Sequence, residues 1–541
     1  MANYLLSLIT FSPLLGVLVI LFMPKEKGRA IRIVAVVTTL IPLVLSAIMY
    51  VTFNQHLGTM QFKENVPWIH IPLNKEGLNN VGSYFFEIRY NLAVDGLSLP
   101  LVFLTALVST MAALASMYIK KRWKTYYILF LLLESGMFGV FMAQDLFLFF
   151  MFFEITLVPT FFLIGIWGYM QRERAANKFL IYNGIGSAIM LIAFLIMINT
   201  AGFTVMQESG KTLLYYSGDI QQIMHNLMDK AAQVNQVYQN NSNPFFMSAY
   251  MKGIIFALLI VAFGIKLPIF PFHTWMLKVH TEAPPSVVMI HSGILLKMGA
   301  YGLLRFGILV FPQEAKNWAV VLAILGLINI LYGAILALRQ NEFKLVLAYS
   351  SISHMGVVLL GLAAFNVIGL QGAIFQLVSH GLISALFFLI VGILYERTGT
   401  TELDRLGGLA KSMPFTGGVL MLTGMASLGL PLLSGFISEF LSFLGLYDSM
   451  PVVTIVGTLG IIFTAVYVLR GVMRITFGPI QEKFQEIRDA RFSEALPMIT
   501  LAAFIILIGI YPAVLNEPMQ QTVNGFNQFI HDVVKNVKMG G

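Results

Sequence analysis

Fourteen apolar runs of about 20 residues each constrain this chain more than any other feature of its sequence. At 1.5 Å per residue, one such run is long enough to cross the hydrocarbon core of a bilayer as a helix. Hydrophobic residues make up 57% of the chain and charged residues only 11%, which excludes a set of soluble domains. The sequence therefore predicts an all-α polytopic membrane protein. The runs lie near 3–23, 31–53, 97–118, 126–143, 146–168, 178–199, 251–272, 284–311, 318–338, 343–363, 366–395, 414–446, 452–474 and 495–513.

Basic residues gather in alternate connectors between these runs. With the N-terminus outside, the cytoplasmic connectors hold 22 of the 34 Lys and Arg residues, as the positive-inside tendency requires. An even number of spans then places both termini on the outer side. The net charge of +8 forms no contiguous patch, so it serves as a topology signal and indicates no nucleic-acid partner.

Sequence motifs for a cofactor or a metal are absent. Without cysteine the chain cannot form disulfides or hold an iron–sulfur cluster. His273 and His280 are seven residues apart, which fits no zinc motif, and no phosphate-binding glycine loop or nucleophile triad is present. We therefore expect no cofactor, no metal and no self-contained active site in this chain. Segment 218–240, with apolar residues at helical spacing, predicts an amphipathic helix at the outer surface, or alternatively a solvated connector.

An internal repeat joins the seventh and twelfth apolar runs. Ile265 to Phe272 resembles Leu428 to Phe436, and each segment carries Leu-Pro near the middle of its run. The two runs are an odd number of spans apart, so they cross the membrane in opposite directions. Related segments in opposite directions are typical of an inverted repeat.

Several charged residues lie inside apolar runs, among them Glu154, Lys266 and Lys297, and a charge there costs several kcal/mol unless it is paired or hydrated. Glu154 precedes Pro159 by five residues, and Lys266 precedes Pro268 by two. Proline breaks the backbone hydrogen-bond ladder, and irregular backbone at this depth is typical of a wet cavity. Lys297 follows in the next run. These residues are candidates for proton transfer, and a static ion pair that holds helices together is the alternative.

Two histidines and a glutamate extend this series. His354 and His380 have serine or glycine neighbours, and histidine titrates near neutral pH, which suits a proton relay. The alternative is a histidine that bonds only to a nearby carbonyl. Glu439 follows the proline of the twelfth run and could exchange protons with one aqueous side. Glu134 and His291 are secondary candidates.

At these positions the sequence resembles a known family, the antiporter-like membrane subunits of respiratory complex I and of multisubunit cation/proton antiporters. Lys266 to Pro284 reads KLPIFPFHTWMLKVHTEAP, close to the family form KxPxxPFHxWLPDAHxEAP, with Met276 and Lys278 among the departures. Gly293 to Arg305 matches GxLLKxGxYGxxR, and Lys344 to Gly356 matches the LAYSSIxHMG motif. Glu439 stands where sister subunits usually carry lysine, which points to the subunit M, or chain-4, branch.

The resemblance implies a fourteen-helix core with two inverted five-helix repeats, helices 4–8 and 9–13, and with broken helices 7 and 12. The corresponding parts of the chain are 1–125, 126–311, 312–476 and 477–541. It implies sister antiporter-like subunits and other membrane-arm subunits as partners, and a bacterial inner or plasma membrane as the location. It also implies a proton pathway, namely Glu154, Lys266, Lys297, His354, His380 and Glu439.

The expected function is proton translocation coupled to quinone reduction elsewhere in an NAD(P)H- or ferredoxin-dependent complex. Quinone reduction would shift the Glu154 and Lys266 pair, and a proton would then pass Lys297, His354 and His380 to Glu439, which releases it outside. Two alternatives stay open at this point. One is a subunit of a sodium/proton antiporter, and the other is a purely structural membrane-arm subunit.

Overall fold

The structure is a computed structural model that describes residues 4–73, 83–208, 211–229, 232 and 245–539. Within these residues, thirteen helical segments are long and apolar enough to cross a membrane. Twelve of them are α1 (Leu5–Phe22), α2 (Gly28–Thr52), α3 (Ser98–Ala115, extended by a short 3₁₀ turn, Ser116–Tyr118), α4 (Trp123–Met142), α5 (Leu146–Trp167), α6 (Arg172–Thr200), α8 (Ala249–Lys266), α13 (Ala319–Arg339), α14 (Phe343–Ala363), α15 (Val367–Thr398), α18 (Pro451–Thr476) and α19 (Phe492–Ile510).

The thirteenth segment, Pro285–Ile308, is a helix with two π-helical stretches. It runs through α10 (Pro285–Ile290), a π stretch (His291–Leu295), α11 (Leu296–Gly302) and a second π stretch (Leu303–Ile308). Such π stretches are rare and occur frequently at functional sites. This segment and α15 lie wholly inside the bundle, whereas only 33% of the apolar part of α2 or α18 is buried. The buried segments carry Lys297 and His380.

The predicted breaks in the seventh and twelfth spans are confirmed. The seventh span is α8 followed by α9 (Thr274–Glu282), and the twelfth is α16 (Pro414–Ser427) followed by α17 (Ser434–Tyr447). Each half of the twelfth span has 14 residues, too few to cross alone, so this broken pair accounts for the fourteenth predicted crossing. The relation of the two five-helix groups as inverted repeats stays a prediction.

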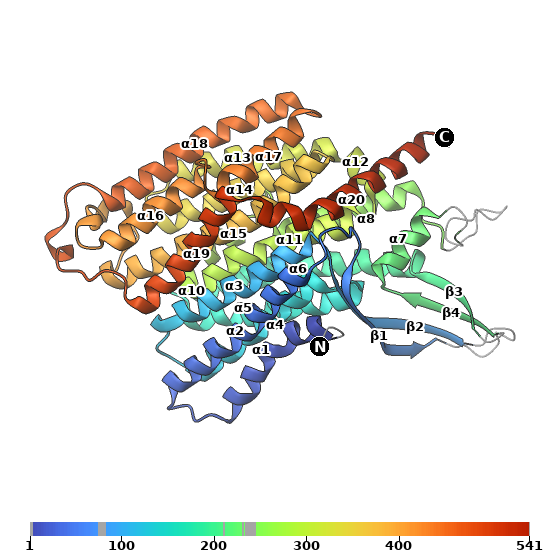
Figure 1. The fold of residues 1–541 in the computed structure, drawn as a ribbon, viewed down its shortest axis with the longest axis horizontal. Coiled ribbons are helices and arrows are strands. Elements are labelled where there is room, and N and C mark those ends of the chain that lie inside the picture. The colour runs from blue at the N-terminus through green and yellow to red at the C-terminus, as the bar shows by residue number, and fades with distance from the viewer. Residues whose placement is uncertain (1–3, 74–82, 209–210, 230–231, 233–244, 540–541) are drawn as a thin grey trace.

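A four-stranded sheet was not anticipated from the sequence. Its strands are β1 (Gln61–Pro72), β2 (Ser83–Val94), β3 (Phe203–Glu208) and β4 (Lys211–Ser217), in the order β1-β2-β4-β3. The β1–β2 and β3–β4 pairs are antiparallel, and β2 pairs with β4 in parallel. Figure 1 shows this sheet at one end of the helix bundle, which we call the sheet end. The connectors α1–α2 and α18–α19 lie at the opposite end.

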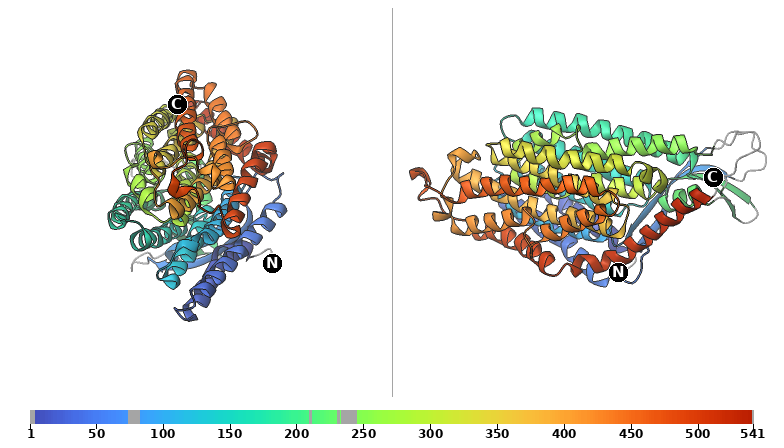
Figure 2. Two further views of the ribbon diagram at one scale, coloured as in Figure 1. Left: turned by 90° about the vertical axis from the view of Figure 1, so that its left-hand side faces the viewer. Right: turned by 90° about the horizontal axis from the view of Figure 1, so that it is seen from above.

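Two further helices cover the sheet end. The predicted amphipathic helix is confirmed in part as α7 (Ile220–Met228), with Ile220, Ile223 and Leu227 buried. Ala231, at the end of the predicted apolar face, lies outside the described residues. The C-terminal helix α20 (Ala513–Met539) turns away from α19 and runs along the bundle toward the sheet end (Figures 1 and 2). The remaining short elements are α12 (Pro312–Asn317) and the 3₁₀ turns Leu403–Arg405, Leu409–Lys411 and Glu482–Phe484.

Candidate proton pathway

Lys266 is the last residue of α8, directly before the break in the seventh span. The Gly264 carbonyl, which Pro268 cannot bind, accepts a hydrogen bond from the Ile269 N–H group at 2.8 Å. Asn329 of α13 satisfies two more groups of the break, since its Oδ1 accepts from the Phe270 N–H group at 2.8 Å and its Nδ2 donates to the Pro268 carbonyl at 3.3 Å. The irregular backbone is therefore hydrogen-bonded by protein groups, and it holds the lysine at mid-bundle.

The Lys266 ammonium is buried among aromatic rings. Its Nζ lies 5.0 Å from the ring centre of Phe153 and 5.5 Å from that of Phe179, and it has no hydrogen-bond partner among the described residues. Glu154 on α5 is close enough to act on this lysine electrostatically, yet the described residues contain no direct ion pair between the two. The structure thus holds this pair in a separated arrangement.

A pair of histidines lies beyond Lys266. The Nε2 atom of His280 on α9 lies 3.0 Å from the Nδ1 atom of His291, and both rings are fully buried. His291 contacts the rings of Trp275 and Phe179, and the Phe179 ring also faces Lys266. The second nitrogen of each histidine has no partner among the described residues. The histidine pair therefore has one free nitrogen on each ring, as a relay that passes protons in both directions requires.

Lys297 lies at the centre of the bundle and joins the two halves of the pathway. Its Nζ lies 2.7 Å from Nδ1 of His380 on α15, and it also donates to the Ser292 carbonyl in the first π stretch. Lys297 is fully buried, and His380 is 4% exposed. A lysine and a histidine at this distance share one proton position, so the proton can move between them without large side-chain motion.

Past His380, the structure places His354 and Glu439 together. The rings of His380 and His354 lie 5.4 Å apart, and Nδ1 of His354 lies 3.2 Å from the Oε1 atom of Glu439. Gln376 and Ser427 also contact the His354 ring, at 3.2 and 3.3 Å. The contacts thus run from Lys297 to His380, then to His354 and to Glu439. In these contacts His380 lies between Lys297 and His354, whereas the order expected from the sequence places His354 before His380.

A small polar cavity lies beside these residues. It has a volume of about 20 Å³ and is lined by His354, Gln376, Ser379, His380 and Glu439, among others. A cavity of this size holds about one water molecule, and these polar groups supply the hydrogen bonds that a buried water needs. Such a water could bridge the 5.4 Å between the two histidine rings.

Not every sequence candidate joins this series. Glu134 on α4 is fully buried, and neither of its carboxylate oxygens has a hydrogen-bond partner among the described residues. Conversely, His280 is part of the series, although in the sequence it stands out only as a possible metal ligand whose spacing from His273 fits no metal motif. Its signal was the motif that contains it, HTWMLKVH, where His280 lies on a helix and His273 before it. His273 instead contacts the Tyr332 hydroxyl at 3.1 Å.

Metal binding has no geometric support in the described part of the chain. No group of three or more His, Asp or Glu side chains there lies close enough to hold one ion. The titratable residues are arranged in a row, each near the next, instead of converging on one point. This arrangement suits the transfer of a proton along the bundle, because each step needs only a neighbouring donor and acceptor.

Comparison with known proteins supports a single family. Residues 143–464 match the family described as NADH:quinone oxidoreductase/Mrp antiporter, transmembrane. The chain is 38% identical to NAD(P)H-quinone oxidoreductase chain 4 2 of Thermosynechococcus vestitus over 97% of this chain and 92% of that protein. It is 34% identical to NADH-quinone oxidoreductase subunit M of Rhodobacter capsulatus over 97% of both chains.

Solved structures show the same fold. A chain of respiratory complex I from Thermus thermophilus with bound NADH superimposes with a TM-score of 0.78 at 26% identity, over 98% of this chain and 100% of that one. A chain of the Mrp complex from Dietzia sp. DQ12-45-1b gives a TM-score of 0.77 at 19% identity, over 98% of this chain and 99% of that one. At that identity, the second likeness concerns the fold alone.

Proposed function

The chain belongs to the NADH:quinone oxidoreductase/Mrp antiporter transmembrane family, and on that premise we propose that it is a proton-translocating membrane subunit of an NAD(P)H–quinone oxidoreductase. The observation that carries this proposal is the buried contact between Lys297 and His380 at 2.7 Å, continued by His354 and Glu439. Electron transfer takes place in other subunits of the complex, and this chain moves protons when they supply the energy.

The Glu154 and Lys266 pair is the part that responds to the rest of the complex. Glu154 lies on α5 and is partly exposed, and its neighbours Met151 and Ile155 face outward. A charge or hydration change in an adjacent subunit reaches Glu154 first and alters how tightly Lys266 holds its proton. The proton then passes the histidine pair to Lys297, and from there to His380, His354 and Glu439.

The orientation in the membrane belongs to the same proposal. The connectors at the end opposite the sheet include the basic segment Lys120 to Lys124, and the positive-inside tendency assigns that end to the cytoplasm. The sheet end and both termini then lie on the outer side of a bacterial plasma membrane. Sister antiporter-like subunits and other membrane-arm subunits are the proposed partners.

An antiporter subunit that exchanges sodium for protons is the second candidate. The description of the matched family, which includes the Mrp antiporter, favours it. The chain-4 and subunit M relatives, which align with almost the whole chain, favour the quinone-linked complex. Glu439 agrees with the latter, because the resemblance places lysine there in the antiporter subunit.

Replacement of Lys266 by alanine tests the proposal. In the assembled complex, reconstituted into liposomes, Lys266→Ala should abolish quinone-coupled proton uptake, because the series loses its first cationic step. The matched control is Lys278→Ala, which removes an exposed lysine of the adjacent helix α9. Proton uptake at the control's level in an assembled Lys266→Ala complex would exclude the pathway. A sodium requirement for proton transport in the control would favour the antiporter.

A further inference from the structure

A second buried ion pair lies near the proton pathway but outside it. The Arg305 guanidinium, in the second π stretch, lies 2.8 Å from the Asp95 carboxylate in the turn before α3. Asp95 is 1% exposed and Arg305 3%, so both charges are removed from water. Asp95 also accepts hydrogen bonds from the Leu97 and Ser98 N–H groups. The pair is thus held firmly at the sheet end.

This ion pair lies on the same helical segment as Lys297. Lys297, Tyr301 and Arg305 are spaced four residues apart, so they follow one another along the segment toward the sheet end. Arg305 Nε donates to the Tyr301 hydroxyl at 3.2 Å, and that hydroxyl donates to the Phe141 carbonyl at 2.9 Å. A proton that left Lys297 toward the sheet end would meet these groups.

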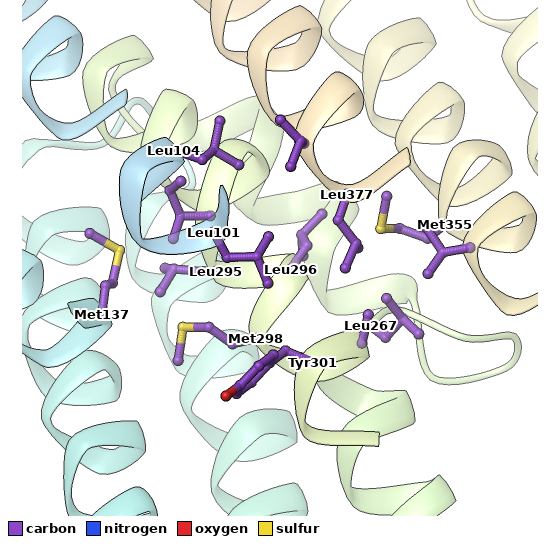
Figure 3. Packing of buried hydrophobic residues seen from close by; sticks show 14 of the residues in the cluster. Leu101, Leu104, Met137, Leu267, Leu295, Leu296, Met298, Tyr301, Met355 and Leu377 are labelled. Atoms are coloured by element: carbon purple, nitrogen blue, oxygen red, sulfur yellow. The ribbon is translucent and has the colours of Figure 1, made fainter. Parts of the chain in front are cut away.

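None of these groups can pass a proton on. A guanidinium has five donors and no acceptor, and it does not lose its proton in a protein. The Tyr301 hydroxyl already donates to a backbone carbonyl, which cannot accept and release a proton in turn. Met298 lies beside Tyr301 in Figure 3, and both belong to the buried hydrophobic cluster, so the surroundings of this hydroxyl are apolar. A fixed cation in a dry passage excludes protons, as in other membrane pores.

Helix α20 closes the site from the sheet end. The Thr522 Oγ1 atom accepts a hydrogen bond from the Gly96 N–H group at 3.1 Å, and the ring of Phe526 lies 5.8 Å from the Arg305 guanidinium carbon. Met519 and Val523 of the same helix are fully buried. A Cβ atom on Gly96 would lie 2.1 Å from the Pro518 carbonyl oxygen, so α20 is seated directly on this glycine.

We infer that the Asp95–Arg305 pair and α20 together form a seal that keeps protons on Lys297 from escaping at the sheet end, so that they pass sideways to His380 instead. This inference rests on the proposed proton-translocating function. It assigns roles to residues outside the pathway itself, namely Arg305 as the barrier, Asp95 as its anchor and α20 as the cover. Loss of the seal should let protons leak without electron transfer.

The test measures how fast an imposed pH gradient decays in liposomes that contain the assembled complex, without electron donor. Gly96→Ala, which forces α20 away, and Arg305→Met, which removes the cation, should each speed the decay several-fold. Gly525→Ala on α20 is the matched control, because an added Cβ there meets nothing within 4 Å. Thr522→Val, which removes only the hydrogen bond to Gly96, serves in place of Gly96→Ala if that variant does not assemble.

The route of the leak distinguishes a seal from a merely loosened helix packing. Adding Lys297→Met to a leaking variant should return the decay to the rate of the control, since the leak must pass through that lysine. A decay that stays fast in the double variant, or unchanged decay in both single variants, would overturn the inference. Failure of the proposed pathway has a different readout, because the assembled Lys266→Ala complex would then pump protons at the level of its control.

Discussion

The Nε2 atom of His280 lies 3.0 Å from the Nδ1 atom of His291, and this pair lies in the interior of the bundle, where His291 is close enough to both Lys266 and Lys297 to interact with them electrostatically. Without it, the first half of the pathway would have no titratable group between the two lysines in the contacts of the described residues. Two neutral histidines that share a hydrogen bond can transfer a proton by changing tautomers, with little movement of either ring.

Replacement of His280 by leucine should therefore interrupt the first half of the pathway. We expect quinone-coupled proton uptake to fall by about tenfold or more, which corresponds to a barrier higher by at least about 1.4 kcal/mol. His273→Leu is the matched control, because His273 contacts Tyr332 instead of the pathway. Equal proton uptake in the two assembled variants would show that His280 has only a packing role.

Asn329 should be important for stability because it satisfies the broken backbone beside Lys266. Asn329→Leu leaves the Phe270 N–H group and the Pro268 carbonyl without their side-chain partner in the bundle interior. Each unsatisfied buried group costs about 1–3 kcal/mol, so the melting temperature of the purified complex should fall measurably. Gly253→Ala on α8 is the control, since an added Cβ there meets nothing within 4 Å. A melting temperature equal to that of the control would show that other groups or water replace the asparagine.

The stability of the sheet end should depend on pH through Asp145. This residue caps α5 by accepting from the Phe147 and Leu148 N–H groups, and the turn that holds it pairs with Gly218. Burial raises the pKa of Asp145 from 3.8 to about 7, and the nearby Asp219 carboxylate also raises it, while the backbone N–H groups lower it. Between these two pH values the folded protein holds a proton that the unfolded chain has released.

The contribution of Asp145 to stability should therefore be greatest below about pH 4, fall as the pH rises and level off above about pH 7. Asp145→Asn keeps a capping side chain but removes the titration, so the variant should lack this part of the pH dependence. The measurement is the melting temperature of both complexes across this pH range, compared as a difference at each pH. A difference that does not change with pH would show that Asp145 is ionised in the folded protein.

Local sequence predicts the structure of this chain wherever a single physical requirement acts on each segment separately. A bilayer demands about 20 apolar residues per crossing, and every predicted run corresponds to a helix or a broken helix. Proline next to Lys266 predicted the break in the seventh span, because proline cannot bond within a helix at any position of the interior. The sheet was missed because its strands lie in the long connectors between apolar runs, although β2 alternates apolar and polar residues from Phe86 to Leu92, as a strand does.

The partners of the buried charges were beyond the reach of sequence. His273 and His280 have similar local surroundings in one motif, yet only His280 faces His291. Glu134 looked like a further pathway member, but the side chains around it in the described structure form no hydrogen bond to it. Helix phase and the angle between packed helices decide such contacts, and neither is encoded in the spacing of residues along one segment.

The sequence by itself determined that the chain crosses the membrane many times and carries titratable residues at the depth of the hydrocarbon core, since both follow from the cost of exposing polar groups to lipid. Only the tertiary structure decided which residues meet. In the row of contacts His380 lies between Lys297 and His354, Glu154 and Lys266 form no direct ion pair, and α20 packs against the site of Asp95 and Arg305. These contacts join residues from distant parts of the chain, and they exist only after the helices have packed.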